Sequence, residues 1–90
     1  MEHFNHYING QFSAGSGRFE TTNPANGLPW ATFPSATEDE SNFAIESAYK
    51  ALYEGPWSEL SPTQRGKLIH KLGDLILKHA SELGELETRD

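Results

Sequence analysis

The stretch ETTNPANG, residues 20–27, decides how the first third of the chain folds. Pro24 fixes its own φ and pushes Asn23 towards extended backbone, while Gly27 can take the positive φ that closes a turn. Runs that favour β structure lie on either side, RFETT before the turn and LPWATF after it. We therefore expect two strands joined by a chain reversal. Pro29 lacks an amide donor, so we expect an edge strand, or a ladder that ends there.

A second turn signal stands near the start of the chain, in HYINGQF (residues 6–12). Asn-Gly in the middle of this run is typical of a two-residue hairpin loop, because both central residues of that loop need a positive φ. Tyr7 would then face Phe12 across a tight pair of strands. The following SAGSG is expected to serve as a flexible connection.

Explicit start signals predict a helix over about residues 38–54. Thr37 followed three residues later by Glu40 is a capping box. The acidic residues between them place negative charge at the positive end of the helix dipole. One apolar stripe follows at helical spacing: Ile45, Ala48, Tyr49 and Leu52. Gly-Pro at positions 55 and 56 then ends the helix.

A second helical region is expected over about residues 62–90. It begins with Ser61 as cap, Pro62 in the first helical position and Gln64 completing another capping box. A broad apolar face follows: Leu68, Ile69, Leu72, Leu75 and Ile76. Gly66 and Gly73 lower the helix propensity, so tertiary contact must hold this helix or approach it closely there.

Ser81 is predicted to cap a further helix, ELGELETRD, which reaches Asp90 without a glycine stop signal. The fold class is therefore α+β, with antiparallel strands and a hairpin over about residues 6–33, followed by two to three helices. So few strands do not make a stable sheet alone, and 90 residues bury little surface. We expect this chain to be one piece of a larger packed body.

Composition excludes several function classes. The chain has no cysteine, so no disulfide, thiolate ligand or thiol nucleophile can form in it. The formal net charge is −6, and residues 37–60 hold six acidic side chains against one lysine. Such a stretch repels phosphate, so we expect no nucleic-acid partner. Apolar runs are too short to span a bilayer and the start lacks a signal peptide, which predicts a cytoplasmic protein with no membrane partner.

Some isolated residues have simple structural explanations. His3 and His6 have a spacing seen in metal sites, but we expect them on a disordered terminus with no third ligand nearby. Trp30 and Trp57 are interpreted as packing anchors rather than ligand stackers.

Taken in order, the motifs resemble one known family. YINGQF, TTNPANG, the acidic capped helix, a Trp near its end, SPTQRGKLIHKLGDLI and LETRD follow the order and spacing of the N-terminal region of NAD(P)-dependent aldehyde dehydrogenases. The resemblance runs from about Tyr7 to Asp90. It implies that residues 1–90 form the N-terminal part of the cofactor-binding domain. In the full-length family the enzyme oxidises an aldehyde to a carboxylic acid, uses NAD or NADP, and assembles as dimers or tetramers.

The resemblance also implies that no catalytic residue lies in this chain. The family's nucleophilic Cys, its water-activating Glu, its oxyanion-binding Asn and its nucleotide-binding residues all belong to regions beyond this one. The lack of cysteine agrees, because a thiohemiacetal cannot form without sulfur. We expect the chain alone to be inactive and to bind no NAD or NADP. Its role would be that of a scaffold packed against the rest of the enzyme.

One family site does fall within this region. Some members bind a monovalent cation with oxygens from the residues before the Asn-Pro pair and from an Asp that ends the LET motif. The matching positions are Thr21, Thr22 and Asp90. Hard oxygen ligands suit an alkali cation, and this chain alone would bind one weakly. The alternative is that the threonines are β-forming residues and Asp90 a solvated acid.

A second function class stays open at this point. The chain could be a free-standing small module that binds a protein partner through the apolar helix face between Leu68 and Ile76. Concentration-dependent association of a well-ordered chain would favour the module. A poorly structured chain that aggregates would favour the enzyme segment.

Overall fold

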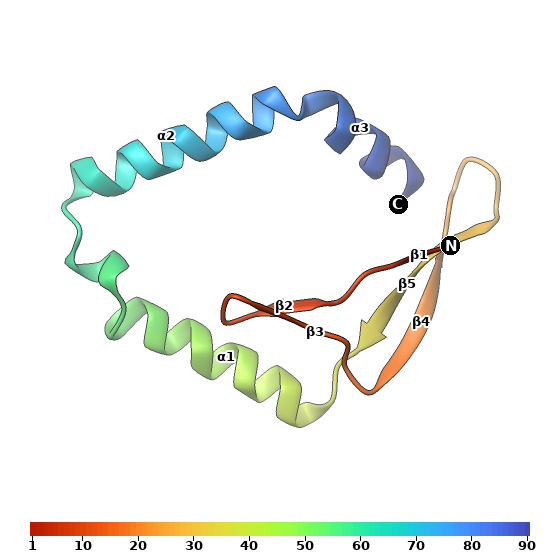
Figure 1. The fold of residues 1–90 in the computed structure, drawn as a ribbon, viewed down its shortest axis with the longest axis horizontal. Coiled ribbons are helices and arrows are strands. Elements are labelled where there is room, and N and C mark those ends of the chain that lie inside the picture. The colour runs from red at the N-terminus through yellow and green to blue at the C-terminus, as the bar shows by residue number, and fades with distance from the viewer.

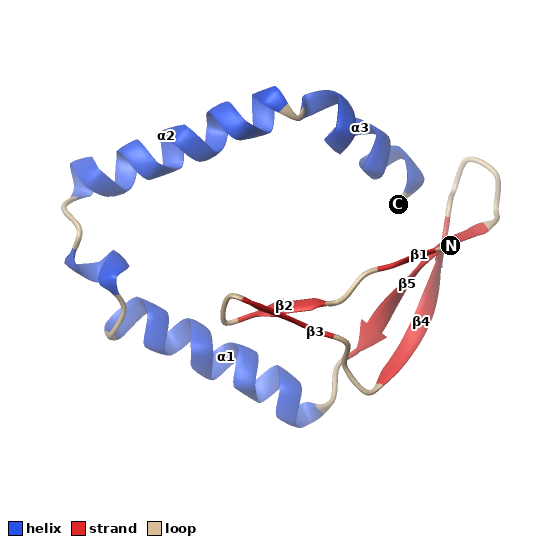
Figure 2. Ribbon diagram, viewed as in Figure 1, coloured by secondary structure: helices blue, strands red, loops and turns tan.

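The computed structural model describes residues 1–90, with strands first and helices after them (Figure 2). Its elements are β1 (Glu2–His3), β2 (His6–Ile8), β3 (Gln11–Ser13), β4 (Gly17–Thr22), β5 (Pro29–Ser35), α1 (Glu38–Tyr53), the 3₁₀ helix η1 (Pro56–Glu59), α2 (Pro62–Lys78) and α3 (Ala80–Arg89). The α+β class and the order of elements are confirmed. No helix combines the length and apolar character that crossing a membrane requires.

The chain forms an open arc rather than a ball. The helices run along the outside, and the sheet closes the arc near both termini (Figure 1). The Cα radius of gyration is 16.8 Å, whereas a compact chain of this length has about 12 Å. The accessible surface is 7227 Å², against about 5,200 Å² for a folded monomer of this mass. Much surface that a folded domain would bury is therefore open.

Strand β5 is the centre of a three-stranded sheet, with β1 on one side and β4 on the other. It runs antiparallel to β4, from the pair Gly17 and Ser35 to the pair Thr22 and Pro29. The three buried residues of the chain all lie on β5: Ala31, Thr32 and Pro34. The small core of this chain therefore sits on its central strand.

Aromatic side chains cover one part of this sheet. Phe33 stacks on Phe4 with ring centroids 5.3 Å apart and on Phe19 at 5.9 Å. Phe4 meets the edge of Trp30 at 5.9 Å. Such pairs contribute about 0.5–1.5 kcal/mol each beyond the area that they bury. Trp30 is thus a packing residue, as expected from the sequence.

The turn between β4 and β5 has the expected chemistry. Gly27 has φ +72°, and its amide donates to the Asn23 carbonyl at 2.8 Å. The Asn23 side chain accepts from the amide of Ala25 at 2.8 Å, so it closes a local turn of its own. The ladder ends at Pro29, one of the two predicted alternatives, after an irregularity between Thr21 and Thr22. The other alternative, an edge strand, is wrong, because β5 is paired on both sides.

The Asn-Gly hairpin is also confirmed. Strands β2 and β3 pair in antiparallel register, and Tyr7 faces Phe12 with ring centroids 4.9 Å apart. Asn9 and Gly10 have φ values of 53° and 74°, the left-handed backbone that the favoured two-residue loop requires.

The expected disorder of the N-terminus is wrong, because residues 2–3 form a strand parallel to β5. Arg18 holds this strand in place. Its Nη2 donates to the carbonyl oxygens of Phe4 and Thr32, and its Nε donates to Thr32 Oγ1 at 2.8 Å. His3 Nδ1 lies 2.7 Å from the same hydroxyl. A contact between positions 14 residues apart leaves no local pattern in the sequence.

Both predicted capping boxes are present. The amide of Glu40 donates to Thr37 Oγ1 at 3.1 Å, and the amide of Thr37 donates to Glu40 Oε2 at 3.2 Å. At the start of α2, the amide of Gln64 donates to Ser61 Oγ at 3.2 Å, and the reciprocal bond measures 2.9 Å. These caps satisfy amides that the first helical turn leaves without partners.

The predicted cap at Ser81 is wrong. Helix α3 begins at Ala80, and His79 serves both as the last cap of α2 and as the first of α3. The amide of His79 donates to the Leu75 carbonyl at 3.1 Å, while its own carbonyl accepts from Leu83 at 3.0 Å. A one-residue joint leaves no loop for a side-chain cap, so Ser81 lies inside the helix. Helix η1 was not predicted either.

Replacing Thr37 by Ala should lower the free energy of unfolding by about 1 kcal/mol, because the amide of Glu40 loses its acceptor, Thr37 Oγ1. Urea unfolding followed by circular dichroism measures the change. Ser41→Ala is the matched control, since this exposed serine follows the first turn of the same helix. Equal midpoints for the two variants would contradict a stabilising cap.

Candidate functional site

The three predicted cation ligands come from two parts of the chain, the end of β4 and the residue after α3. Thr21 is half-buried and pairs with Ala31, while the exposed Thr22 pairs with Pro29 beside the turn. Asp90 is exposed and follows α3. Figure 1 shows this C-terminal end beside the sheet, close to the N-terminus.

Asp90 also lines an apolar concavity of about 610 Å³ between the sheet and the last two helices. Its apolar walls are Phe4, Trp30, Phe33, Ile76, Leu83 and Leu86. Glu87 and Asp90 are its two charged residues. Trp30 directly precedes Ala31, the pairing partner of Thr21. Asp90 and Trp30 therefore line one concavity, and Trp30 lies next in the chain to the partner of Thr21.

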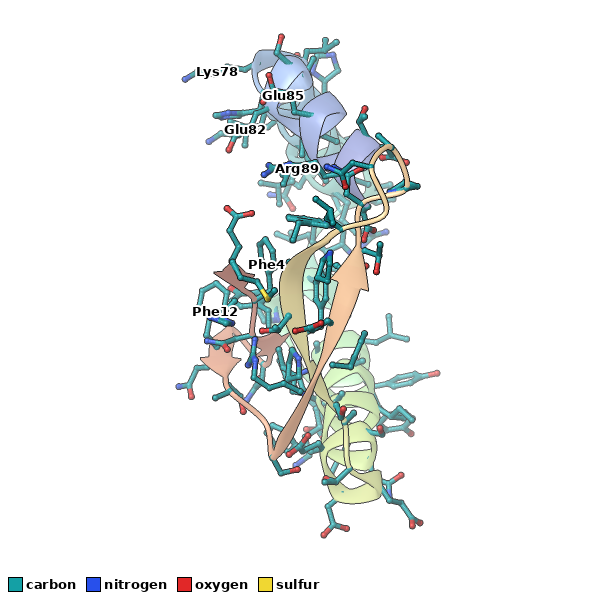
Figure 3. All side chains as sticks on the ribbon, turned by 90° about the vertical axis from the view of Figure 1, so that its right-hand side faces the viewer. Phe4, Phe12, Lys78, Glu82, Glu85 and Arg89 are labelled. Atoms are coloured by element: carbon teal, nitrogen blue, oxygen red, sulfur yellow. The ribbon has the colours of Figure 1, made fainter.

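The side chain of Arg89 links the last helix to the sheet. Its guanidinium carbon lies 4.9 Å from the centroid of the Trp30 ring, within the range of a cation–π interaction. Its Nη1 lies 3.5 Å from Glu2 Oε2. In Figure 3, Arg89 lies at the end of α3 that is nearest the sheet. No local sequence pattern predicts these contacts, because Trp30 and Glu2 lie far from Arg89 along the chain.

The donor atoms at this end of the sheet fit one class of ion. Threonine and carbonyl oxygens with a single carboxylate are hard, weakly charged ligands, which suit an alkali cation. The structure holds no group of three or more His, Cys, Asp or Glu residues that could bind a metal ion. The donor set thus fits a monovalent ion better than a transition metal.

The two N-terminal histidines contact separate partners. His3 pairs with the Thr32 hydroxyl, as described above, whereas His6 Nε2 lies 3.4 Å from Glu40 Oε2. That second distance allows an ion pair when His6 is protonated, but the atoms are not aligned for a hydrogen bond. His6 thus lies where the hairpin approaches the start of α1.

The apolar face of α2 has no cover within the chain. Exposed fractions on this face range from 47% at Leu75 to 59% at Ile69, and no residue of the helix is buried. A Cβ at Gly66 or Gly73 would meet no atom within 4 Å, so no segment of this chain approaches the helix there. The contacts expected from the sequence would have to come from elsewhere.

The two tryptophans differ in their cover. Trp57 is 39% exposed. The indole Nε1 of Trp30 is inaccessible to solvent and yet has no acceptor. An unsatisfied buried donor of this kind costs about 1–3 kcal/mol.

Comparison with known proteins yields one consistent family. The aldehyde dehydrogenase family profile matches residues 12–90. A (Z)-2-((N-methylformamido)methylene)-5-hydroxybutyrolactone dehydrogenase of Acinetobacter baylyi is 47% identical over the whole chain, which covers 18% of that protein. A 5-carboxymethyl-2-hydroxymuconate semialdehyde dehydrogenase of Escherichia coli is 40% identical over the whole chain and 19% of its own length.

The fold has counterparts of the same kind among solved structures. An NAD⁺ complex of an aldehyde dehydrogenase from Bacillus cereus matches 99% of this chain with a TM-score of 0.92 and 38% identity. An NAD-dependent aldehyde dehydrogenase from Sinorhizobium meliloti matches 98% with a TM-score of 0.90 and 27% identity. In both cases the match covers 18% of the solved chain.

These matches give no support to a free-standing module, because each relative carries the same segment within a much longer chain. The chain spans less than a fifth of the length of these relatives, in their N-terminal portion. The resemblance first indicated by the turn and cap motifs is confirmed over nearly every residue. From its sequence and its fold alike, this chain belongs to the aldehyde dehydrogenase family.

Proposed function

We propose that residues 1–90 are the N-terminal scaffold segment of an enzyme that oxidises an aldehyde to a carboxylic acid with NAD or NADP. The observation that carries this proposal is the close match of the whole chain to a solved aldehyde dehydrogenase with bound NAD⁺. The names of both solved neighbours favour NAD as the cofactor. The segment would belong to the cofactor-binding domain of a cytoplasmic enzyme that assembles as a dimer or tetramer.

The chemistry itself would take place outside these residues. The reaction needs a nucleophile that attacks the aldehyde carbon and a hydride acceptor beside it. The chain contains no thiol, so it cannot supply the family's nucleophile. Its contribution is to position other elements by packing against them.

The open surfaces of the chain support this scaffold role. Its accessible surface exceeds the value for a folded monomer of its mass by about 2,000 Å². Full burial of one leucine of the α2 face would stabilise the protein by about 1.5–3 kcal/mol. The rest of the same polypeptide would supply this cover.

The complete natural gene product should oxidise aldehydes with NAD or NADP, whereas residues 1–90 alone should show no activity. The intact mass of that product, detected in its source cell through peptides of this segment, comes first. Absorbance of the reduced nicotinamide then measures turnover over a panel of aliphatic, aromatic and semialdehyde substrates. A stable product of 10.0 kDa, the mass of this chain, would contradict the proposal. So would a longer product that oxidises none of the panel.

Leu72→Ala should destabilise the complete gene product by about 2–5 kcal/mol, because a scaffold face is buried there and the change leaves a cavity. Leu77→Ala is the matched control, since Leu77 lies on the opposite side of α2 and is 76% exposed. It should change the free energy of unfolding by at most about 0.5 kcal/mol. Thermal unfolding of the two variants gives the comparison. If both substitutions lower the free energy of unfolding by the same small amount, the apolar face of α2 stays exposed in the complete gene product.

A weak monovalent-cation site at Thr21, Thr22 and Asp90 is the second part of the proposal. Asp90 lines the same concavity as Trp30, which precedes the pairing partner of Thr21, and the donor atoms of the three proposed ligands are hard oxygens. Asp90 follows α3, where the negative end of the helix dipole disfavours a carboxylate. A bound cation would offset that repulsion.

Potassium or sodium, at a concentration a few times its dissociation constant from the site, should stabilise the complete gene product by about 1 kcal/mol relative to tetramethylammonium. Asp90→Asn should abolish this difference. Glu87→Gln is the control, because Glu87 is the other acid of the same concavity. Melting temperatures at constant ionic strength measure the effect. Identical melting in all three cations would count against a site.

A further inference from the structure

Arg89 is the one side chain that joins the first and last elements of the chain. Its Nη1 lies 3.5 Å from Glu2 Oε2, across a separation of 87 residues. The same guanidinium lies over the ring of Trp30, with its carbon 4.9 Å from the ring centroid. A single cation thus contacts both β1 and the central strand β5.

Helix α3 has little else to hold its C-terminal end. None of its residues is buried, and only Leu86 and Arg89 are even half-buried. It joins α2 through the single residue His79, which allows the two helices to change their angle. Leu86 lines the apolar concavity, and an apolar contact of this kind has no preferred direction. The directional contacts at this end of the helix are those of Arg89.

Charge makes this contact specific to a cation. Arg89 is the only basic residue of α3, which otherwise carries Glu82, Glu85 and Glu87. Without the guanidinium, the carboxylate of Glu2 would face this acidic helix and Asp90. Arg89 also lies at the negative end of the helix dipole, where a cation is favourable. Its loss would therefore turn attraction between the two ends of the chain into repulsion.

We propose that Arg89 is a positioning residue, which seats the end of α3 on Trp30 and Glu2 and thereby holds Asp90 ready for a monovalent cation. The inference rests on the cation site proposed above. Arg89 itself does not bind the ion, since like charges repel. Arg89 acts on Asp90 through the backbone, because the two residues are adjacent in the chain. The Asp90 amide donates to the Leu86 carbonyl at 3.1 Å, so Asp90 follows the end of α3 when that end moves.

A purely structural role would have a different signature. Loss of a structural contact lowers the melting temperature by the same amount at every cation concentration. Loss of a positioning contact also raises the potassium concentration that gives half of the stabilisation, because Asp90 must then be ordered on binding. The half-saturating concentration therefore separates the two roles.

The experiment uses the complete natural gene product and three variants of it. Arg89→Met removes the charge and keeps an unbranched chain over Trp30, and Arg89→Lys keeps a cation. Lys78→Met is the matched control, because it removes a basic residue from the last turn of α2. Melting temperature is measured against potassium chloride, with tetramethylammonium chloride holding the ionic strength constant. Hydrogen exchange of peptides over residues 1–5 and 84–90 reports the two ends directly.

We expect Arg89→Met to raise the half-saturating potassium concentration by about threefold. This ratio corresponds to the free energy of an exposed cation–π contact. Arg89→Lys should shift it less, and Lys78→Met should not shift it. Exchange should quicken in both terminal peptides of Arg89→Met alone. If hydrogen exchange of the two terminal peptides is the same in Arg89→Met and in the wild type, Arg89 does not hold α3 on the sheet. If exchange is faster but the half-saturating potassium concentration is unchanged, Arg89 does not position Asp90. A wild-type protein without any potassium response would instead overturn the cation site itself.

Discussion

The antiparallel ladder between β4 and β5 is the constraint on which the rest of the structure depends. It places β5 in the centre of the sheet, where all three buried residues of the chain lie. It also aligns Arg18 with the backbone of Thr32, so that one guanidinium can hold β1 on the far side of β5. The aromatic cluster around Phe33 and Trp30 follows from the same register.

Local chemistry explains which parts of this fold could be predicted from the sequence. The turn at Gly27, the Asn-Gly hairpin and both capping boxes each depend on residues within a few positions of one another. Strand β1 and the contacts of Arg89 join residues far apart, so no short pattern encodes them. The wrong prediction at Ser81 has a related cause, because a residue that favours a cap position does not start a helix when the preceding helix ends only three positions earlier, at Lys78. The predicted cation ligands rest on the family resemblance, because no local pattern in the sequence marks a threonine pair and a distant aspartate as one site.

The exposed surface of the chain has a physical meaning once the family is known. Helix α2 exposes Leu and Ile side chains along one face and contains two glycines, which lower its intrinsic helix propensity. Both features are unfavourable on a solvated surface and suit close packing against another segment. Such a face is costly in isolation and favourable once a neighbouring segment covers it.

Arg18 and Arg89 show how a segment with so small a core can still hold a defined shape. Apolar burial is scarce here, and the directional, charge-assisted contacts of two arginines add to it. Arg18 reinforces the paired strands, whereas Arg89 connects the sheet to α3, which the backbone ladder does not reach. Both act at β5, Arg18 on Thr32 and Arg89 on Trp30, which makes the central strand the common reference for both ends of the chain. Within the fold, these two contacts fix both ends of the chain relative to β5, and the angle of the apolar helix faces to the sheet follows from them.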